Sequence, residues 1–207
     1  MTTEPRLHAT LSKEKTSHTH DIQSTEMFIA DQLKKRSISE YLLYMWQIED
    51  TIRAYGLDAD RMAEEYIPQF RLDEARSAQL KEWYESLIQM MREEGVAEHG
   101  HLQVNNNVII YLTDLHTQLL KSSKHPFYSA AYYKALPFIV ELRGKSEESQ
   151  KKNEIENCFD ALYCTMLLRA KKKNISAGTA SAIDKIAHFI GLLSDYYKKD
   201  KAGTLEL

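Results

Sequence analysis

The segment Tyr41 to Arg53, with the sequence YLLYMWQIEDTIR, decides the fold of this chain. A helix turns by about 100° per residue, so Met45 and Trp46 share one apolar stripe, and Glu49 and Arg53 fall on that stripe rather than opposite it. An unpaired charge on a buried face is strongly destabilising. The segment therefore predicts a mostly buried helix that either contains an internal Glu49–Arg53 ion pair or lines a polar pocket.

The overall composition is that of an ordinary globular protein. Of 207 residues, 43% are hydrophobic and 28% are charged, and the net charge is -3. This balance gives no global positive field, so nucleic acid is not an expected partner. No apolar run approaches the roughly 20 residues of a membrane span, and no secretory signal is visible, so we expect a cytoplasmic protein that does not enter a membrane. Cys158 and Cys164 are poorly placed to bridge, because they point to different sides of one predicted helix.

The chain divides into three parts. Residues 1–26 are polar, contain few large apolar side chains and show no periodicity, which predicts a disordered tail. A second interpretation is that Met27 is the true start and that the tail comes from an upstream start choice. Residues 27–200 predict a single all-helical domain, and residues 201–207 a flexible C-terminus.

The apolar residues of this domain recur at helical spacing almost throughout. Two segments, 41–52 and 132–142, are apolar nearly all round, which predicts that both are central. Consecutive amphipathic helices with short connections predict an all-α fold, a compact antiparallel helical bundle of about six main helices plus one short helix. The main helices are expected from Ser37 or Ser39 to Gly56, over 73–95, 104–122 and 127–143, from Ile155 to about 170, and over 179–199; the short helix covers 60–67, and residues 146–153 are expected to form a charged loop.

Two further helices carry polar residues on or beside their core stripes. One has Asn105 and His116 at the edge of its stripe, and the next has Lys134 and Glu141 together on one face. If these side chains meet the first pair, they form a buried polar network or the wall of a binding site. The candidate polar cluster consists of Glu49, Arg53, Asn105, His116, Lys134 and Glu141. For Glu49 and Arg53 we expect a structural role, because buried ion pairs that hold a bundle in register are common.

Four segments are long enough to be specific: YLLYMWQIEDTIRA (41–54), WYESLIQMMREEGV (83–96), HLQVNNNVIIYLTDLH (101–116) and YSAAYYKALPFIVELR (128–143). They resemble an uncharacterised bacterial family, seen chiefly in Bacteroidetes and catalogued only as a domain of unknown function. The resemblance covers Met27 to about Lys199. It implies a compact all-helical intracellular protein and brings no catalytic residues.

Metal ligands are sparse in the sequence. A carboxylate-bridged dimetal bundle needs two Glu-x-x-His motifs, and the chain has a single one, Glu98 to His101, interrupted by Gly100. A mononuclear site built from Glu49, His101 and other histidines has no supporting ligand spacing. We therefore predict no metal and no cofactor, and we expect His101 and His116 to hydrogen-bond backbone carbonyls at the edge of the core.

Motifs of nucleophilic catalysis and phosphate binding are absent from the sequence, which has no Gly-x-Ser-x-Gly turn and no Gly-rich loop. We predict an uncharacterised soluble helical protein that is a non-enzymatic protein- or ligand-binding module. The alternative is a small-molecule-binding pocket or an enzyme that uses the buried polar cluster. The expected partner is an unidentified protein or small ligand, or a second copy that docks on the apolar face of Tyr133, Leu136 and Val140.

Overall fold

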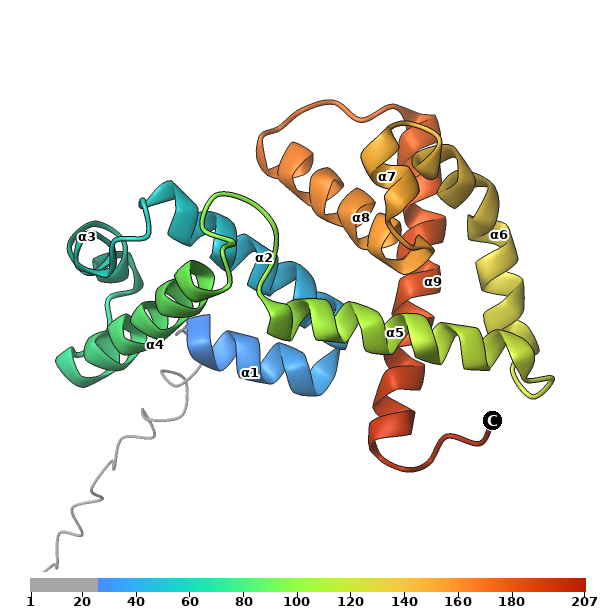
Figure 1. Ribbon diagram of the computed structural model, residues 1–207, viewed down its shortest axis with the longest axis horizontal. Helices are drawn as coiled ribbons and strands as arrows, with labels where there is room; N and C mark the ends of the chain where they lie inside the picture. The colour runs from blue at the N-terminus through green and yellow to red at the C-terminus, as the bar shows by residue number, and fades with distance from the viewer. Residues whose placement is uncertain (1–25) are drawn as a thin grey trace, which may run out of the picture.

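Helices make up all the regular secondary structure that the structure describes. The computed structural model describes residues 26–207, and within this range it has nine α-helices, one 3-10 helix and no strand (Figure 1). The prediction of an all-α fold is confirmed. The elements are α1 (Glu26–Arg36), α2 (Ile38–Ala54), α3 (Ala59–Glu65), η1 (Ile67–Phe70), α4 (Glu74–Glu93), α5 (Gln103–Lys121), α6 (Pro126–Arg143), α7 (Glu147–Lys151), α8 (Glu154–Ala170) and α9 (Ala177–Lys201).

Several helix boundaries follow directly from capping residues. The side chain of Ser37 accepts a hydrogen bond from the Glu40 amide and begins α2, and Asp73 accepts from the Arg76 amide and begins α4. Such caps satisfy amides that have no partner within the helix. Gly56 follows α2 with φ of +72°, a left-handed conformation that glycine adopts without steric cost. Of the two N-caps considered, Ser37 and Ser39, the structure uses Ser37, and the predicted start at Asp73 and end at Gly56 are confirmed.

Two of the helices were not predicted, α1 and α7. The five-residue α7 lies in the segment expected as a charged loop, and Ser146 caps it by accepting from the Ser149 amide. In α1 the periodic apolar signal is weak, because Ala30 is its single buried apolar residue. Residues 1–25 of the predicted tail lie outside the described residues.

Glu26, which the sequence assigned to the tail, begins α1 and is buried. The Tyr66 hydroxyl donates to its carboxyl group at 2.8 Å. Burial raises the pKa of Glu26 to about 7, although the hydrogen bond from Tyr66 opposes this shift. Glu26 is therefore part of the packed domain.

Helix α2 lies between the two ends of the molecule and packs against helices from both. Helix α2 packs against α1, α4, α5, α8 and α9, and α9 packs against α5, α6 and α8 as well. Figure 1 shows α3 and α4 at one end of the molecule, α6 to α9 at the other, and α5 reaching from α2 to α6. The central position predicted for 41–52 is confirmed. The central position predicted for 132–142 is wrong, because α6 lies at the outer edge and Tyr133 and Val140 remain 63% and 59% exposed.

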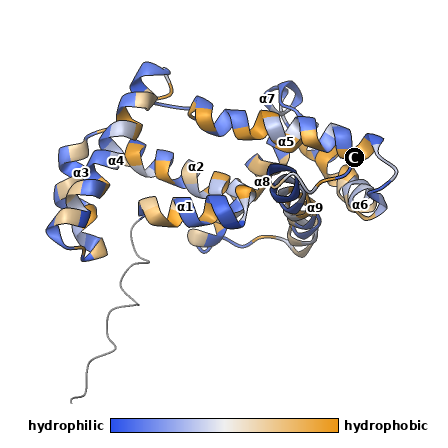
Figure 2. Cartoon of the chain, turned by 90° about the horizontal axis from the view of Figure 1, so that it is seen from below, coloured by the Kyte–Doolittle hydropathy of each residue, from blue (hydrophilic) through white to orange (hydrophobic). Residues whose placement is uncertain are grey.

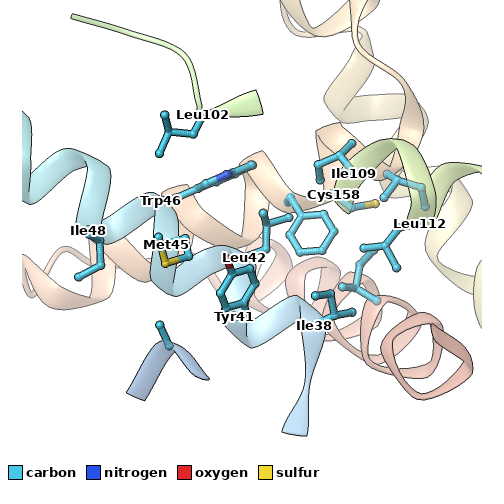
Figure 3. Packing of buried hydrophobic residues seen from close by; sticks show 14 of the residues in the cluster. Ile38, Tyr41, Leu42, Met45, Trp46, Ile48, Leu102, Ile109, Leu112 and Cys158 are labelled. Atoms are coloured by element: carbon cyan, nitrogen blue, oxygen red, sulfur yellow. The ribbon is translucent and has the colours of Figure 1, made fainter. Parts of the chain in front are cut away.

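The core around α2 joins side chains from distant parts of the chain. In Figure 3, Leu42 and Trp46 of α2 lie near Ile109 and Leu112 of α5 and Cys158 of α8. All five side chains are almost fully buried. The burial of apolar surface is the main source of stability of a helical fold. Neither cysteine forms a disulfide.

The helices also differ in how apolar they are along their length. Figure 2 shows hydrophilic and hydrophobic stretches alternating along α2, α4 and α5. Among residues 26–207, no helix combines the length and the apolar character that crossing a membrane would require.

Candidate functional site

The carboxylate of Glu49 lies at the centre of a buried polar network. Glu49 is 0% exposed. Its Oε1 accepts hydrogen bonds from the Leu102 amide at 3.0 Å and from Asn105 Nδ2 at 2.7 Å, and its Oε2 lies 2.6 Å from His101 Nδ1. Three donors therefore surround this carboxylate, and the pair with His101 is a buried ion pair when the imidazole is protonated.

Helix α5 begins without a side-chain cap, and Glu49 occupies the place of one. Leu102 is the N-cap residue of α5, and its side chain cannot accept a hydrogen bond. Helix N-termini carry unpaired amides and a partial positive charge, so a carboxylate from a neighbouring helix is favourable there. The carboxylate also determines the orientation of Asn105, which must present its amide nitrogen. The Asn105 Oδ1 atom is buried without a partner among the described residues.

His101 links this network to the aromatic core. Its ring stacks on Trp46 with centroids 4.0 Å apart and planes 8° from parallel. The prediction that His101 hydrogen-bonds a backbone carbonyl is wrong, because its Nδ1 faces the Glu49 carboxylate. The sequence could not show this, since 52 residues separate the two.

Arg53 does not pair with Glu49. Its guanidinium lies 2.8 Å from Asp50 Oδ1, and its Nη2 donates to the carbonyl oxygens of Val96 and Gly100. The predicted Glu49–Arg53 ion pair is therefore wrong. Arg53 lies one turn beyond Glu49 on α2, and it contacts the segment between α4 and α5 through the carbonyl groups of Val96 and Gly100.

The structure separates the other members of the candidate polar cluster. Asn105 contacts Glu49, whereas His116 lies further along α5 and contacts Tyr128 of α6. Lys134 and Glu141 are exposed on α6, and Glu141 lies 3.5 Å from Lys145. The six residues therefore do not form one cluster.

A second polar region surrounds a cavity between α5, α6 and the N-terminus of α8. The cavity has a volume of about 550 Å³. Cavities of this size accommodate small-molecule ligands. Its lining mixes cationic, hydroxyl and apolar side chains and consists of Thr113, His116, Thr117, Leu120, Lys121, Tyr132, Arg143, Asn153, Glu154 and Ile155.

His116 contacts Tyr128 of α6 through one ring nitrogen, and its other ring nitrogen has no hydrogen bond among the described residues. The imidazole is 6% exposed, and its Nδ1 lies 2.6 Å from the Tyr128 hydroxyl. Burial lowers the pKa of His116, with the charge of Glu154 opposing that shift, and burial raises the pKa of Tyr128. A neutral imidazole can accept at Nδ1 from the Tyr128 hydroxyl or donate to its oxygen. In the first tautomer the proton of His116 resides on Nε2, on a ring that lines the cavity.

Glu154 is the carboxylate of this cavity, and its oxygens already have partners. The Tyr132 hydroxyl donates to Oε2 at 2.8 Å, and Arg143 Nη1 lies 3.8 Å from Oε1. Burial and this hydrogen bond raise the pKa of Tyr132. Arg143 Nε is buried without a hydrogen-bond partner, and Lys121 has no carboxylate within ion-pair distance, among residues 26–207. Two cations therefore face one carboxylate.

Sequence reasoning missed most residues of this cavity. It singled out His116 but not Tyr128 or Tyr132, which face its helix from α6. Their spacing of four residues, which places them on one face of a helix, was an available signal. Arg143 and Glu154 gave no signal, because each lies at a helix end, where charged residues are common.

The described part of the chain holds no group of three or more His, Cys, Asp or Glu side chains arranged to bind a metal ion. The sequence pattern of a family described as "Domain of unknown function (DUF4924)" matches residues 27–204. Among curated proteins and solved structures, no match to the chain was found.

Proposed function

The chain belongs to this DUF4924 family, and we propose that it is a non-enzymatic module that binds a small carboxylate-bearing molecule in the cavity between α5, α6 and α8. One observation carries the proposal: the cationic donors Lys121 and Arg143 line a cavity whose single carboxylate, Glu154, is already hydrogen-bonded. Such a surplus of donors favours a ligand that supplies acceptors and a negative charge.

The rest of the lining supports a ligand with a compact apolar body. Leu120 and Ile155 line the cavity beside the ring of Tyr132. Ligand sites typically combine an apolar wall with a few polar groups that fix the orientation of the ligand. An aromatic or branched aliphatic monocarboxylate matches both features.

A larger hollow of about 750 Å³ beside α3 and α4 is a weaker candidate. Its one lining cation, Arg92, already donates to the Leu57 carbonyl at 2.8 Å. Four carboxylates also line it, those of Asp58, Asp60, Glu85 and Glu93. The Glu49 network is also a weaker candidate, because its carboxylate is fully buried and has three donors from the protein.

The chemistry of the cavity favours binding over catalysis. Nδ1 of His116 faces a phenol rather than a carboxylate that would make the imidazole a stronger base. The hydroxyl groups of Thr113 and Thr117 both donate to backbone carbonyls, so neither is activated as a nucleophile. A bacterial source and a cytoplasmic location stay predictions from the sequence.

Benzoate and its neutral isostere benzamide test the proposal by titration of the ¹⁵N-labelled protein. We expect benzoate to shift amide resonances of α5, α6 and the start of α8, and benzamide to bind far more weakly. Arg143→Gln should weaken benzoate binding by about tenfold, since a charge-assisted hydrogen bond is lost. The matched control is Arg169→Gln, which alters an exposed arginine on α8 away from the cavity lining. Equal binding of the two probes, or shifts confined to other helices, would overturn the proposal.

A further inference from the structure

The outward face of α6 is an exposed apolar stripe. Its members recur at alternating spacings of three and four residues, and they are Ala130, Tyr133, Pro137, Val140 and Gly144. Tyr133 and Val140 are 63% and 59% exposed. This spacing is that of the contact seam between two packed helices. Figure 1 shows α6 at the edge of the molecule, with α8 and α9 on its inner side.

Two opposite charges flank one edge of this stripe. Lys134 and Glu141 are seven residues apart, so they lie on the same edge, and both are exposed. Lys134 has no carboxylate within ion-pair distance among residues 26–207. Glu141 lies 3.5 Å from Lys145, and this exposed pair contributes little to stability. The edge thus carries one positive and one negative position available to a partner.

We propose that two copies of this chain pair through the outward face of α6, with the two helices antiparallel about a two-fold axis. In an antiparallel pair a given edge of one helix meets the same edge of the other. In the register that sets Tyr133 against the partner's Gly144, a large side chain faces a small residue. Pro137 then lies against the partner's Val140, and Lys134 lies beside the partner's Glu141.

The positions of Lys134 and Glu141 favour a second copy of this chain, rather than an unrelated protein, as the partner. A two-fold axis repeats each contact, so Glu141 also lies beside the partner's Lys134, and both charges are matched. The same register packs four residues of the stripe, Tyr133, Pro137, Val140 and Gly144, and pairs the charges of its edge. The stripe spans only five positions, so the interface is small, and we expect a dimer that dissociates on dilution.

Sedimentation equilibrium of the full chain, from about 1 µM to about 1 mM, tests the proposal. We expect a concentration-dependent monomer–dimer equilibrium. Lys134→Glu and Glu141→Lys should each weaken it by about tenfold, since each places like charges together at both edge contacts. The double variant Lys134→Glu/Glu141→Lys restores opposite charges, and it should dimerise nearly as well as the original chain. Lys171→Glu is the control, because it reverses an exposed charge away from α6.

All three substituted positions are exposed, so far-ultraviolet circular dichroism should show unchanged helix content in each of the four variants. A chain that stays monomeric at every concentration overturns the proposal and leaves the face to a different protein. A dimer that the single reversals do not weaken, or a double variant as weak as the singles, overturns the antiparallel α6 register. None of these measurements involves a ligand, so the outcome is independent of the carboxylate-binding proposal.

Discussion

Glu49 and His116 are both buried polar groups beside aromatic rings, yet their surroundings differ. The Glu49 carboxylate receives three donors from the protein and has no exposed surface. His116 uses one nitrogen for Tyr128, and its ring lines a cavity of about 550 Å³. The Glu49 carboxylate is closed to solvent and already has three protein donors, whereas His116 lines a cavity that another molecule can occupy. Burial of a polar residue therefore does not by itself mark a binding site, and the completeness of its partners separates structure from recognition.

The largest expected effect comes from breaking the closed network. Glu49→Ala should lower the free energy of unfolding by about 3–5 kcal/mol, because it leaves His101, Asn105 and the Leu102 amide without their acceptor. Urea denaturation measures this loss. Glu40→Ala on the same helix is the control, since that carboxylate is exposed and its ion pair contributes within about 0.5 kcal/mol. Equal effects of the two substitutions would show that the network does not stabilise the fold.

A smaller loss is expected from removing a single donor of that network. His101→Ala should cost about 1–3 kcal/mol, because one oxygen of a buried carboxylate loses its partner and Trp46 loses its stacked ring. The double variant with Glu49→Ala should lose less than the sum of the single losses, since both substitutions remove the same contact. Additive losses in urea denaturation would contradict the direct coupling of the two side chains.

The fold class was predictable because it depends on local signals. Periodic apolar residues and the capping residues Ser37 and Asp73 act within a few positions of the chain. Helix α1 escaped prediction because it buries a single apolar side chain, and α7 because it is barely longer than one turn. The site was predictable only in part. Periodicity correctly placed Glu49 on a buried face, but the donors that complete it come from 52 to 56 residues away.

The same limit explains why the candidate polar cluster did not assemble. A helical wheel shows which side chains share a face but not which helix covers that face. Lys134 and Glu141 share a face as expected, and α6 lies at the edge of the molecule, so that face is exposed. Conversely, the cavity residues Arg143 and Glu154 are adjacent only because α6 and α8 pack against each other.

The free energy of unfolding should depend on pH through His116, the buried imidazole of the cavity. Burial holds the pKa of His116 below its ordinary value of 6.5. Below pH 6.5 the unfolded chain therefore binds a proton at this position more readily than the folded chain. Stability that is present above 6.5 is lost as the pH falls through the lowered pKa. As the pH falls from about 7.5 to about 5, the free energy of unfolding should decline less in His116→Gln than in the original chain. The Gln amide can still hydrogen-bond the Tyr128 hydroxyl. An unchanged pH slope would mean that His116 is not the titrating group.

The smallest expected effect concerns the one carboxylate of the cavity. In Tyr132→Phe, Glu154 loses its hydroxyl donor but remains partly exposed, so water can replace the lost hydrogen bond. The free energy of unfolding should fall by about 0.5–1.5 kcal/mol, well below the loss for Glu49→Ala, because that carboxylate has no access to water.

Binding should change more clearly than stability in this variant. A carboxylate without its phenol partner competes for Arg143 and repels a carboxylate ligand, so benzoate affinity should fall a few-fold while the chain remains folded. Tyr133→Phe is the matched control, because that hydroxyl belongs to a neighbouring, exposed tyrosine of α6. If Tyr132→Phe instead destabilises the protein as much as Glu49→Ala does, the cavity is as closed as the Glu49 network, and the distinction between the two regions fails.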